Sequence, residues 1–406
     1  MAHRKVVGRV ADDAPVRLPI ARLLTVALVV LAVYGAGAIA IAVRSDPIRE
    51  AVIGSAFLDQ GQGRSSAIDA LRGSELSRMG YDGQFVAYIA LDPRHAKAYV
   101  DEPAYRYSRI LYPLVVRAAA LGRSSAVPWA LVLVNVAAAI LLTLAAAAFL
   151  ERCDSSAWYA LIAGLAPGLA FGLLYDLTEP LAYALAAVGA LIIVRRTDHV
   201  GVAVAGLVFG LAALARETTL LFPLTVALAL ALGVSMTTSP KSSRRPKAAL
   251  ALLALACVPA IVWRAVLATT MPGSIAPEGV RPDLVPLRGL VSSMSSSEDW
   301  TQLLFVAIPA MGSIVLATAA IRRTAPWLTA LALNVIGLVL FLPRSSWDGY
   351  PTSSRVTLGI PLAFVLCLPA IETKRVRLVV ALVPLLCWLP GWVKVISDFS
   401  LSVSAP

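Results

Sequence analysis

Charged and aromatic side chains are concentrated in one stretch of this sequence, residues 80–109, which reads GYDGQFVAYIALDPRHAKAYVDEPAYRYSR. It holds one carboxylate between two glycines, Asp82, and two closely spaced arginines, Arg106 and Arg109. A carboxylate can take up a proton as a general base, and an arginine fork donates two parallel hydrogen bonds to a phosphate. The combination favours chemistry on a phosphorylated substrate.

We take Asp82 as the candidate catalytic residue. The candidate substrate-binding residues of the same stretch are Tyr81, Gln84, Arg106, Tyr107 and Arg109. Plainer explanations stay open for both groups. Asp82 precedes a helical pattern, so capping of that helix also accounts for it. Arginines near a membrane surface also extend their side chains toward lipid phosphates without any catalytic role.

Further ionisable residues recur in later loops that the topology derived below places on the same side of a membrane. They add the candidate substrate-binding residues Asp176, Glu179, Arg216, Glu217 and Arg355. The same topology places Arg264 near the outer end of its span, and Arg344 and Asp348 in the last outer loop. Glu179 precedes Pro180, so helix capping explains it equally well. The gathering of charge in separate loops is harder to explain in this way than any single residue.

The composition predicts an integral membrane protein. Of 406 residues, 59% are hydrophobic and only 15% are charged, which is too apolar for a water-facing surface. Four cysteines and three histidines form no spaced set, so neither a disulfide framework nor a zinc site is predicted. The formal charge of +11 does not indicate nucleic acid here, because the side of the membrane that the cations occupy explains it.

Apolar runs predict about eleven transmembrane helices in a single all-α, polytopic domain covering residues 1–406. The predicted spans are Leu23–Val43, Val127–Leu150, Trp158–Leu174, Pro180–Val194, Val200–Ala215, Thr218–Val234, Ala248–Ala268, Thr301–Ile321, Pro326–Leu342, Val356–Ile371 and Leu378–Ile396. A cleavable signal peptide is the alternative for the first run, which is however longer than the usual 7 to 15 residues.

Positive charge orients this topology with the N-terminus in the cytoplasm. The bias to Ala, Val and Arg over Lys fits a bacterial source, so the expected location is the plasma (inner) membrane. Inner segments then hold sixteen Lys and Arg, against five in the outer connections after the second span: Arg216, Arg281, Arg288, Arg344 and Arg355. Residues 44–125 and 269–300 become external loops, and the first of them carries the candidate site. If residues 110–122 also crossed, the charge asymmetry would vanish.

Short amphipathic patterns in these loops predict helices that lie on the membrane surface. One covers residues 81–91, with Tyr81, Phe85, Tyr88 and Ile89 on one face, and ends before Pro93. Residues 110–122 are too short to span and carry Arg117, so we expect a second. A third is expected after Pro282. Trp347 is expected at the membrane interface or as a stacking platform for a sugar.

At GYDGQF, ALDP, PAYRY and RILYP, the sequence resembles bacterial polytopic proteins of the GT-C glycosyltransferase superfamily. The resemblance is specific in residues 80–113, with weaker similarity at TEPLAYAL and ARETTLLFP. It implies a GT-C-like fold and an external active site in the first loop, with Asp82 at its acidic position. The chain departs from the family in lacking a paired Asp-Asp or Asp-Glu directly after the first span, and a large C-terminal soluble domain.

The resemblance implies that a sugar moves from a polyprenyl-phosphate donor to a cell-envelope glycan, lipid or protein acceptor. Membrane lipids are the other expected partners. No cofactor is required by the residue pattern, and use of a divalent metal stays open. A transporter or lipid flippase for envelope precursors is the alternative. It predicts charged or broken helices near the middle of the membrane and repeated halves, neither of which we find. A noncatalytic membrane scaffold is a third interpretation.

Overall fold

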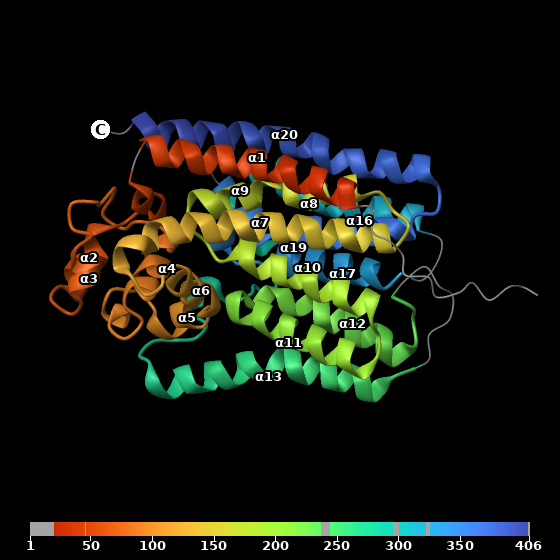
Figure 1. Cartoon of the computed structure of the whole chain (residues 1–406), viewed down its shortest axis with the longest axis horizontal. Coiled ribbons are helices and arrows are strands. Elements are labelled where there is room, and N and C mark those ends of the chain that lie inside the picture. The colour runs from red at the N-terminus through yellow and green to blue at the C-terminus, as the bar shows by residue number, and fades with distance from the viewer. Residues whose placement is uncertain (1–19, 45, 237–243, 295–299, 322–324, 405–406) are drawn as a thin grey trace, which may run out of the picture.

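The structure is a computed structural model that describes residues 20–44, 46–236, 244–294, 300–321 and 325–404. Long helices run side by side along the longest axis, and a group of short helices, α2 to α6, covers one end (Figure 1). Within the described residues there is no β-strand, only an isolated bridge between Gly54 and Ser77. The all-α prediction is confirmed for this part of the chain.

The helices follow in chain order. The first group is α1 Ile20–Arg44, α2 Ser55–Gly61, α3 Ser66–Asp69, α4 Asp82–Leu91, α5 Pro103–Tyr107, α6 Leu111–Ala119, α7 Val127–Arg152, α8 Leu161–Gly164, α9 Pro167–Leu174 and α10 Glu179–Arg195. The second is α11 His199–Ala215, α12 Leu221–Leu232, α13 Pro246–Thr270, α14 Arg288–Ser293, α15 Trp300–Gln302, α16 Ile308–Ala320, α17 Pro326–Val335, α18 Tyr350–Val356, α19 Gly359–Cys367 and α20 Lys374–Ser404. Short 3-10 segments used below are η1 Pro47–Ala51, η5 Glu217–Leu220 and η9 Arg344–Trp347.

Five helical segments among the described residues are long and apolar enough to cross a membrane, and up to seven if each bent pair is one span. The five are Ile20–Val43, Ser124–Arg152, Pro246–Thr270, Trp300–Ala320 and Lys374–Ser397. The bent pairs are Ala157–Gly164 with Pro167–Leu174, at 50°, and Tyr350–Val356 with Gly359–Ala370, at 44°. Pro167 begins the second helix of its pair, where its missing N–H costs no helical hydrogen bond.

All eleven predicted spans coincide with helical segments. Four of these segments are shorter than the five long helices and are not bent pairs: Glu179–Arg195, His199–Ala215, Glu217–Leu232 and Pro326–Leu340. They occupy the middle of the bundle, where α10 packs against α7 and α11, and α17 against α12 and α19. Their helical nature was predicted correctly, and the crossing of a membrane by each of them stays a prediction.

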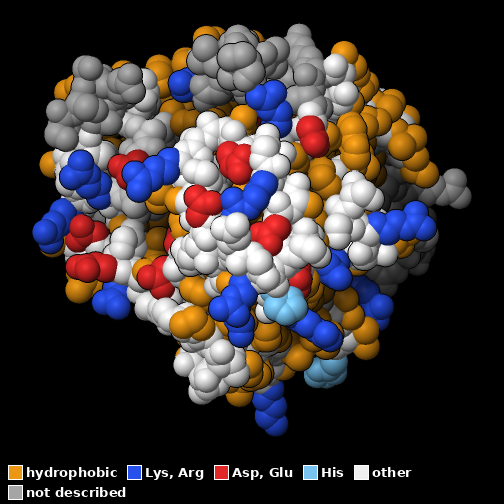
Figure 2. Space-filling view, turned by 90° about the vertical axis from the view of Figure 1, so that its left-hand side faces the viewer, with side chains coloured by type: hydrophobic (Ala, Val, Ile, Leu, Met, Phe, Trp, Pro, Cys, Tyr) orange, Lys and Arg blue, Asp and Glu red, His pale blue; other side chains and the backbone are white. Residues whose placement is uncertain are grey.

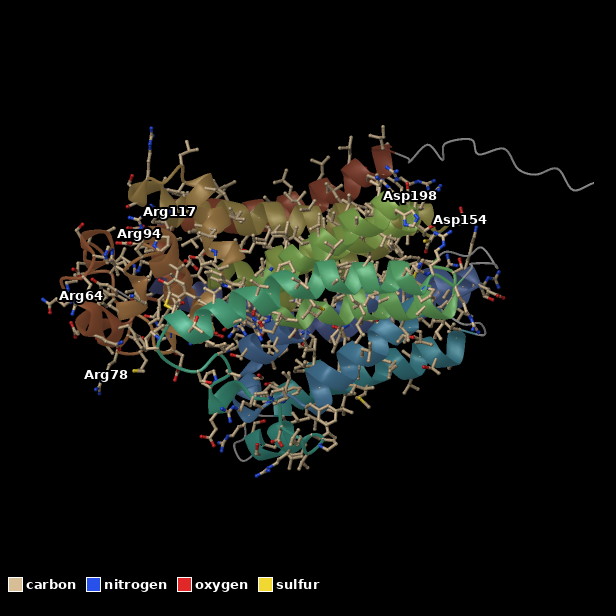
Figure 3. The ribbon with its side chains drawn as sticks, turned by 90° about the horizontal axis from the view of Figure 1, so that it is seen from below. Arg64, Arg78, Arg94, Arg117, Asp154 and Asp198 are labelled. Carbon is tan, nitrogen blue, oxygen red and sulfur yellow. The ribbon has the colours of Figure 1, made fainter. Side chains whose placement is uncertain are left out.

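Charged residues are concentrated at the two ends of the bundle. Arg64, Arg78, Arg94 and Arg117 lie at one end, and Asp154 and Asp198 at the other, with long helices between (Figure 3). We call the end formed by residues 46–126 the loop end. Viewed directly, the loop end displays intermingled acidic and basic side chains (Figure 2). This distribution is the one expected when the middle of a helical bundle lies in hydrocarbon.

Helix α4 differs from the expected surface helix. Gly83 to Leu91 are all buried inside the protein, so the prediction of a helix that lies on the membrane surface was wrong. Its apolar ring contacts explain the burial, since Phe85 meets Phe57 at 4.9 Å between ring centres and Tyr88 meets Tyr99 at 6.0 Å. Both partners come from neighbouring parts of the loop end, which therefore encloses α4 and holds its first turn in place.

Helix α6 has one buried and one exposed face, as expected of a helix at a surface. Tyr112, Pro113 and Val116 are buried, while Leu114 is exposed. Nine residues at 1.5 Å each extend only about 14 Å, so α6 is too short to cross a membrane. Arg117 donates from Nη1 to the carbonyl oxygens of Ala90 at 3.0 Å and Leu91 at 2.7 Å. This arginine therefore supplies hydrogen-bond donors to the last carbonyl groups of α4, which have no partner within the helix.

The second predicted loop also holds less helix than expected. Helix α14 begins only at Arg288, after Leu287 in a left-handed conformation with φ of 62°. The predicted start after Pro282 was wrong, and Leu284 is 90% exposed. The last residues of this loop, 295–299, lie outside the described residues. The expectation for Trp347 was also wrong, because its side chain is fully buried and cannot face a membrane interface or a sugar.

Candidate functional site

Asp82 is the first residue of α4, and its side chain does not cap that helix. Its Oδ1 accepts a hydrogen bond from Arg106 Nη1 at 2.9 Å, and its Oδ2 accepts one from Arg355 Nη2. Tyr81 holds the capping position and makes no side-chain cap either. The explanation of Asp82 as a helix cap is therefore contradicted, and its carboxylate faces two arginines.

The glycines beside Asp82 allow close approach of backbone. A Cβ at Gly83 would lie 2.1 Å from the carbonyl oxygen of Tyr175, and Gly80 has a φ of +70°. Gln84 fixes the same turn, because its Oε1 accepts from the N–H of Gly54 at 3.0 Å and its Nε2 donates to the carbonyl of Met79 at 2.8 Å. The GYDGQ sequence thus locks the first turn of α4 to its neighbours.

Alternating charges connect Asp82 to distant parts of the chain. Arg106 pairs with Asp101 at 2.6 Å on its far side, and Arg355 pairs with Glu179 at 3.0 Å. Glu179 Oε1 also accepts from Arg216 Nη1 at 2.5 Å. This first cluster, Asp101–Arg106–Asp82–Arg355–Glu179–Arg216, contains three carboxylates and three guanidinium groups. Glu179 therefore acts in ion pairs rather than as the helix cap that the sequence also allowed.

A second cluster lies beside the first. Glu217, at the start of η5, accepts from Arg109 Nη2 at 2.9 Å and from Arg109 Nε at 3.3 Å. Arg264 of α13 approaches the same carboxylate, with Nη2 3.4 Å from Oε2. The guanidinium of Arg109 also lies 4.7 Å from the ring centre of Tyr105. Arg109 thus forms a bidentate ion pair, which is a more definite role than reaching for lipid headgroups.

Asp82 and Glu217, the carboxylates that line the cavity beside these arginines, stay ionised. Burial acts to raise the pKa of Asp82, but the charges of Arg106, Arg355 and Arg109 outweigh it and hold that pKa well below its usual range. The pKa of Glu217 is likewise lowered, since Arg109, Arg216 and Arg264 outweigh its burial. The site is therefore a fixed array of full charges at neutral pH.

Residues of both clusters line one cavity of about 620 Å³. That volume falls within the roughly 300–1,000 Å³ typical of small-molecule sites. Its lining residues are Tyr81, Asp82, Tyr105, Arg106, Arg109, Arg216, Glu217, Thr218, Arg264, Ile275, Ala276, Val280, Pro282, Gly337, Leu338, Phe341, Leu342, Pro343, Ser345, Ser346, Asp348, Thr352, Arg355 and Val356. Glu179 lines a neighbouring pocket of about 30 Å³, which Asp82, Arg216 and Arg355 share.

The second predicted loop forms one wall of this cavity. Glu102 accepts from the N–H of Ser274 at 3.1 Å, which ties that wall to the first loop. The N–H of Asp283 donates to the carbonyl of Phe341 at 2.9 Å, and Ser345 Oγ donates to the carbonyl of Gly279. Apolar residues of this wall face the charged clusters, so the cavity offers both a polar and an apolar surface.

Most of the predicted site residues converge on the cavity or its neighbour. Tyr81, Asp82, Arg106, Arg109, Glu179, Arg216, Glu217 and Arg355 do so. Three do not line either space. The side chain of Gln84 makes hydrogen bonds to backbone groups of Gly54 and Met79. Tyr107 is buried and donates to the carbonyl of Pro93 at 2.8 Å, and Asp176 is fully buried.

Two other cavity residues, Arg264 and Asp348, were outside the predicted set. Asp348 lines the cavity and makes no ion pair with a described residue. In the sequence each is only an ionisable residue near the end of an apolar segment. Several other residues share that feature, so it did not single out these two.

Asp176 belongs to a buried acidic pair behind α4. It is fully buried, adopts a φ of 50°, and neither carboxyl oxygen has a hydrogen-bond partner among the described residues. Burial raises the pKa of Asp176 well above its usual value, and the charge of Glu50 is a second, smaller cause. Glu50 of η1 is 7% exposed, and burial raises its pKa to about 7. Sequence reasoning missed Glu50, because nothing local distinguishes it from an exposed carboxylate.

The arrangement can bind an anion and hold an ionised carboxylate beside it. Five arginines line the cavity with three carboxylates, Asp82, Glu217 and Asp348. Two further carboxylates that pair with these arginines, Glu179 and Asp101, lie outside it, so its wall exposes more guanidinium groups than carboxylates. Within the described ranges, no group of three His, Cys, Asp or Glu side chains is placed to hold a metal ion. Comparison of the sequence with models of known protein families gave no match, and comparison with curated proteins gave none.

Proposed function

We propose that this chain is a membrane glycosyltransferase of the GT-C type. It moves a sugar from a polyprenyl-phosphate donor to a glycan, lipid or protein acceptor of the cell envelope. The observation that carries the proposal is the position of Asp82 between Arg106 and Arg355, in a cavity that also gathers Arg109, Arg216 and Arg264. In this proposal eleven helices cross the plasma membrane, with the N-terminus in the cytoplasm and the loop end outside.

The location of the cavity supports a donor carried by a lipid. Its lining combines residues 81–109 of the loop end with residues at the ends of bundle helices, and in this proposal the phosphate of a membrane lipid lies at that boundary. Guanidinium forks match phosphate oxygens in geometry and charge. Guanidinium groups already held in the wall stabilise a leaving phosphate more strongly as its charge grows, so they favour the transition state over the ground state.

The chemical step follows from these parts. Asp82 accepts the proton of the acceptor hydroxyl while the oxygen of that hydroxyl bonds to the anomeric carbon. The bond between this carbon and the phosphate oxygen breaks, and its electron pair leaves with the lipid phosphate. Because Asp82 binds a proton weakly, the proton moves late, when the attacking oxygen has become strongly acidic. Its side chain is 30% exposed, which leaves room for an acceptor hydroxyl.

Movement of an intact lipid-linked sugar is the competing function. Three of the site carboxylates, Asp82, Glu179 and Glu217, each stand at the first residue of a helical segment rather than midway along one, which favours chemistry at a surface over passage through the membrane. A test that separates the two uses purified protein in liposomes with a panel of labelled polyprenyl-phosphate sugars. We expect labelled sugar to appear on an envelope acceptor and free polyprenyl phosphate to accumulate. Transfer from a nucleotide sugar without lipid carrier, or relocation of intact donor without cleavage, would refute the proposal.

A further inference from the structure

The two charged clusters of the cavity are not equivalent. In the first cluster three guanidinium groups face three carboxylates, and Arg106 and Arg355 each direct hydrogen bonds at two of them. In the second, Arg109 and Arg264 share the single carboxylate of Glu217. The second cluster therefore holds two guanidinium groups and one carboxylate, an excess of one positive charge among its own residues.

Arg264 provides that excess charge. Its ion pair with Glu217 is long, at 3.4 Å, and its side chain makes no hydrogen bond to any described residue. A guanidinium carries five N–H donors, so all of them are available to a ligand. The side chain is 35% exposed and lines the cavity. By contrast the side chains of Arg106 and Arg355 are 15% and 7% exposed and already paired.

The position of Arg264 on its helix indicates what kind of ligand reaches it. Helix α13 ends at Thr270, so Arg264 lies about 9 Å from that end at 1.5 Å per residue. Apolar side chains of the same helix, Val258, Ile261 and Val262, are exposed as expected for contact with lipid. The adjacent Trp263 donates from Nε1 to the carbonyl of Tyr107 at 2.8 Å, which fixes α13 against the loop end.

We infer that Arg264 and Arg109 form the phosphate subsite of this cavity, and that Glu217 holds the two arginines in place until a phosphate ester binds between them. The arginines of the first cluster then serve to hold Asp82 rather than the donor. This assignment rests on the proposed function for the identity of the ligand as a lipid phosphate. The recognition chemistry itself is that of any phosphate monoester or diester beside a pair of guanidinium groups.

Binding measurements test the subsite without any need for turnover. Purified protein in detergent is titrated with farnesyl phosphate, with inorganic phosphate and with uncharged farnesol. We expect farnesyl phosphate to bind at least tenfold more weakly to Arg264→Gln, since charge-assisted hydrogen bonds are lost. Arg264→Lys should recover part of the affinity, and Glu217→Gln should bind more tightly than the parent because a competing anion is removed.

Arg344→Gln is the matched control. Arg344 lies in η9 near the same cavity, is exposed, and does not line it. We expect unchanged affinity in this variant, with thermal unfolding showing that every variant is folded. Unaltered farnesyl phosphate binding by Arg264→Gln would overturn the subsite, and so would equal losses in Arg344→Gln.

The three ligands separate the sources of the phosphate. Binding of farnesyl phosphate but not farnesol, and much weaker binding of inorganic phosphate, supports a lipid phosphate. Equal affinity for inorganic phosphate overturns the lipid assignment. Arg264-dependent binding without any sugar transfer would leave the subsite standing and reject the proposed function, so the two failures are distinguishable.

Discussion

Glu50 makes a quantitative prediction about stability. It lies in η1 behind α4, is 7% exposed, and faces the charges of Arg49 and Asp176. Burial raises its pKa from 4.5 to about 7, although the charge of Arg49 acts in the opposite direction. The folded protein therefore holds this proton more tightly than the unfolded chain does.

The sign and size of the effect follow by linkage. Between pH 4.5 and about 7 the folded state binds more protons than the unfolded state, so stability falls as pH rises. Above about pH 7 the free energy of unfolding is lowered by the full amount. Raising the pKa from 4.5 to about 7 corresponds to about 3 kcal/mol. Glu50→Gln keeps the size of the side chain and cannot ionise. We expect it to unfold much like the parent at pH 5 and to be more stable by up to about 3 kcal/mol at pH 8.

Thermal unfolding in detergent at pH 5, 6, 7 and 8 measures this difference. Glu278→Gln is the matched control, because Glu278 is an exposed carboxylate of the loop that closes the cavity. A smaller pH dependence will remain in Glu50→Gln, since the pKa of Asp176 is also raised. A difference between Glu50→Gln and the parent that does not change with pH, or a loss of stability at every pH, would show that Glu50 is not buried as a neutral acid.

Two other predictions follow from the packing and the topology. Gly83→Ala places a methyl group against the carbonyl of Tyr175 and should cost about 1–3 kcal/mol and most of the transferase activity. Gly312→Ala, whose methyl group would meet open space on α16, should be neutral or slightly stabilising, and equal losses in both would refute the packing argument. Cysteines at the exposed Ser66 and Ser274 should react with an impermeant maleimide in whole cells, and one at the exposed Ser156 only after permeabilisation. Labelling of all three from one side would reject the proposed orientation.

The positions of the helices could be predicted from the sequence because apolar length is a local property. The runs that became α1, α7 and α13 needed no knowledge of their neighbours. The importance of residues 80–109 was also visible, since so much polarity in an apolar chain stands out. Asp82, Arg106 and Arg109 do lie on one cavity.

Pairing and burial could not be predicted in this way. Nothing near Asp82 shows that Arg355, far along the chain, supplies its second guanidinium. The amphipathic pattern of α4 predicted a surface helix. The residues that bury it come from other segments, which the local pattern does not reveal. Arg117 looked out of place in an apolar stretch until the structure showed it bonded to the end of α4. Such roles depend on tertiary contacts that local sequence does not determine.

Asp82 provides the most direct test of the account. The measurement is turnover of a polyprenyl-phosphate sugar by the parent, Asp82→Asn and Asp101→Asn. Asp101 also pairs with Arg106 but does not line the cavity, so it controls for loss of an ion pair. We expect Asp82→Asn to fold, to bind donor and to lose at least about 10² in turnover, with Asp101→Asn much less affected. Glycosyl transfer by Asp82→Asn at close to the parent rate would contradict the central claim.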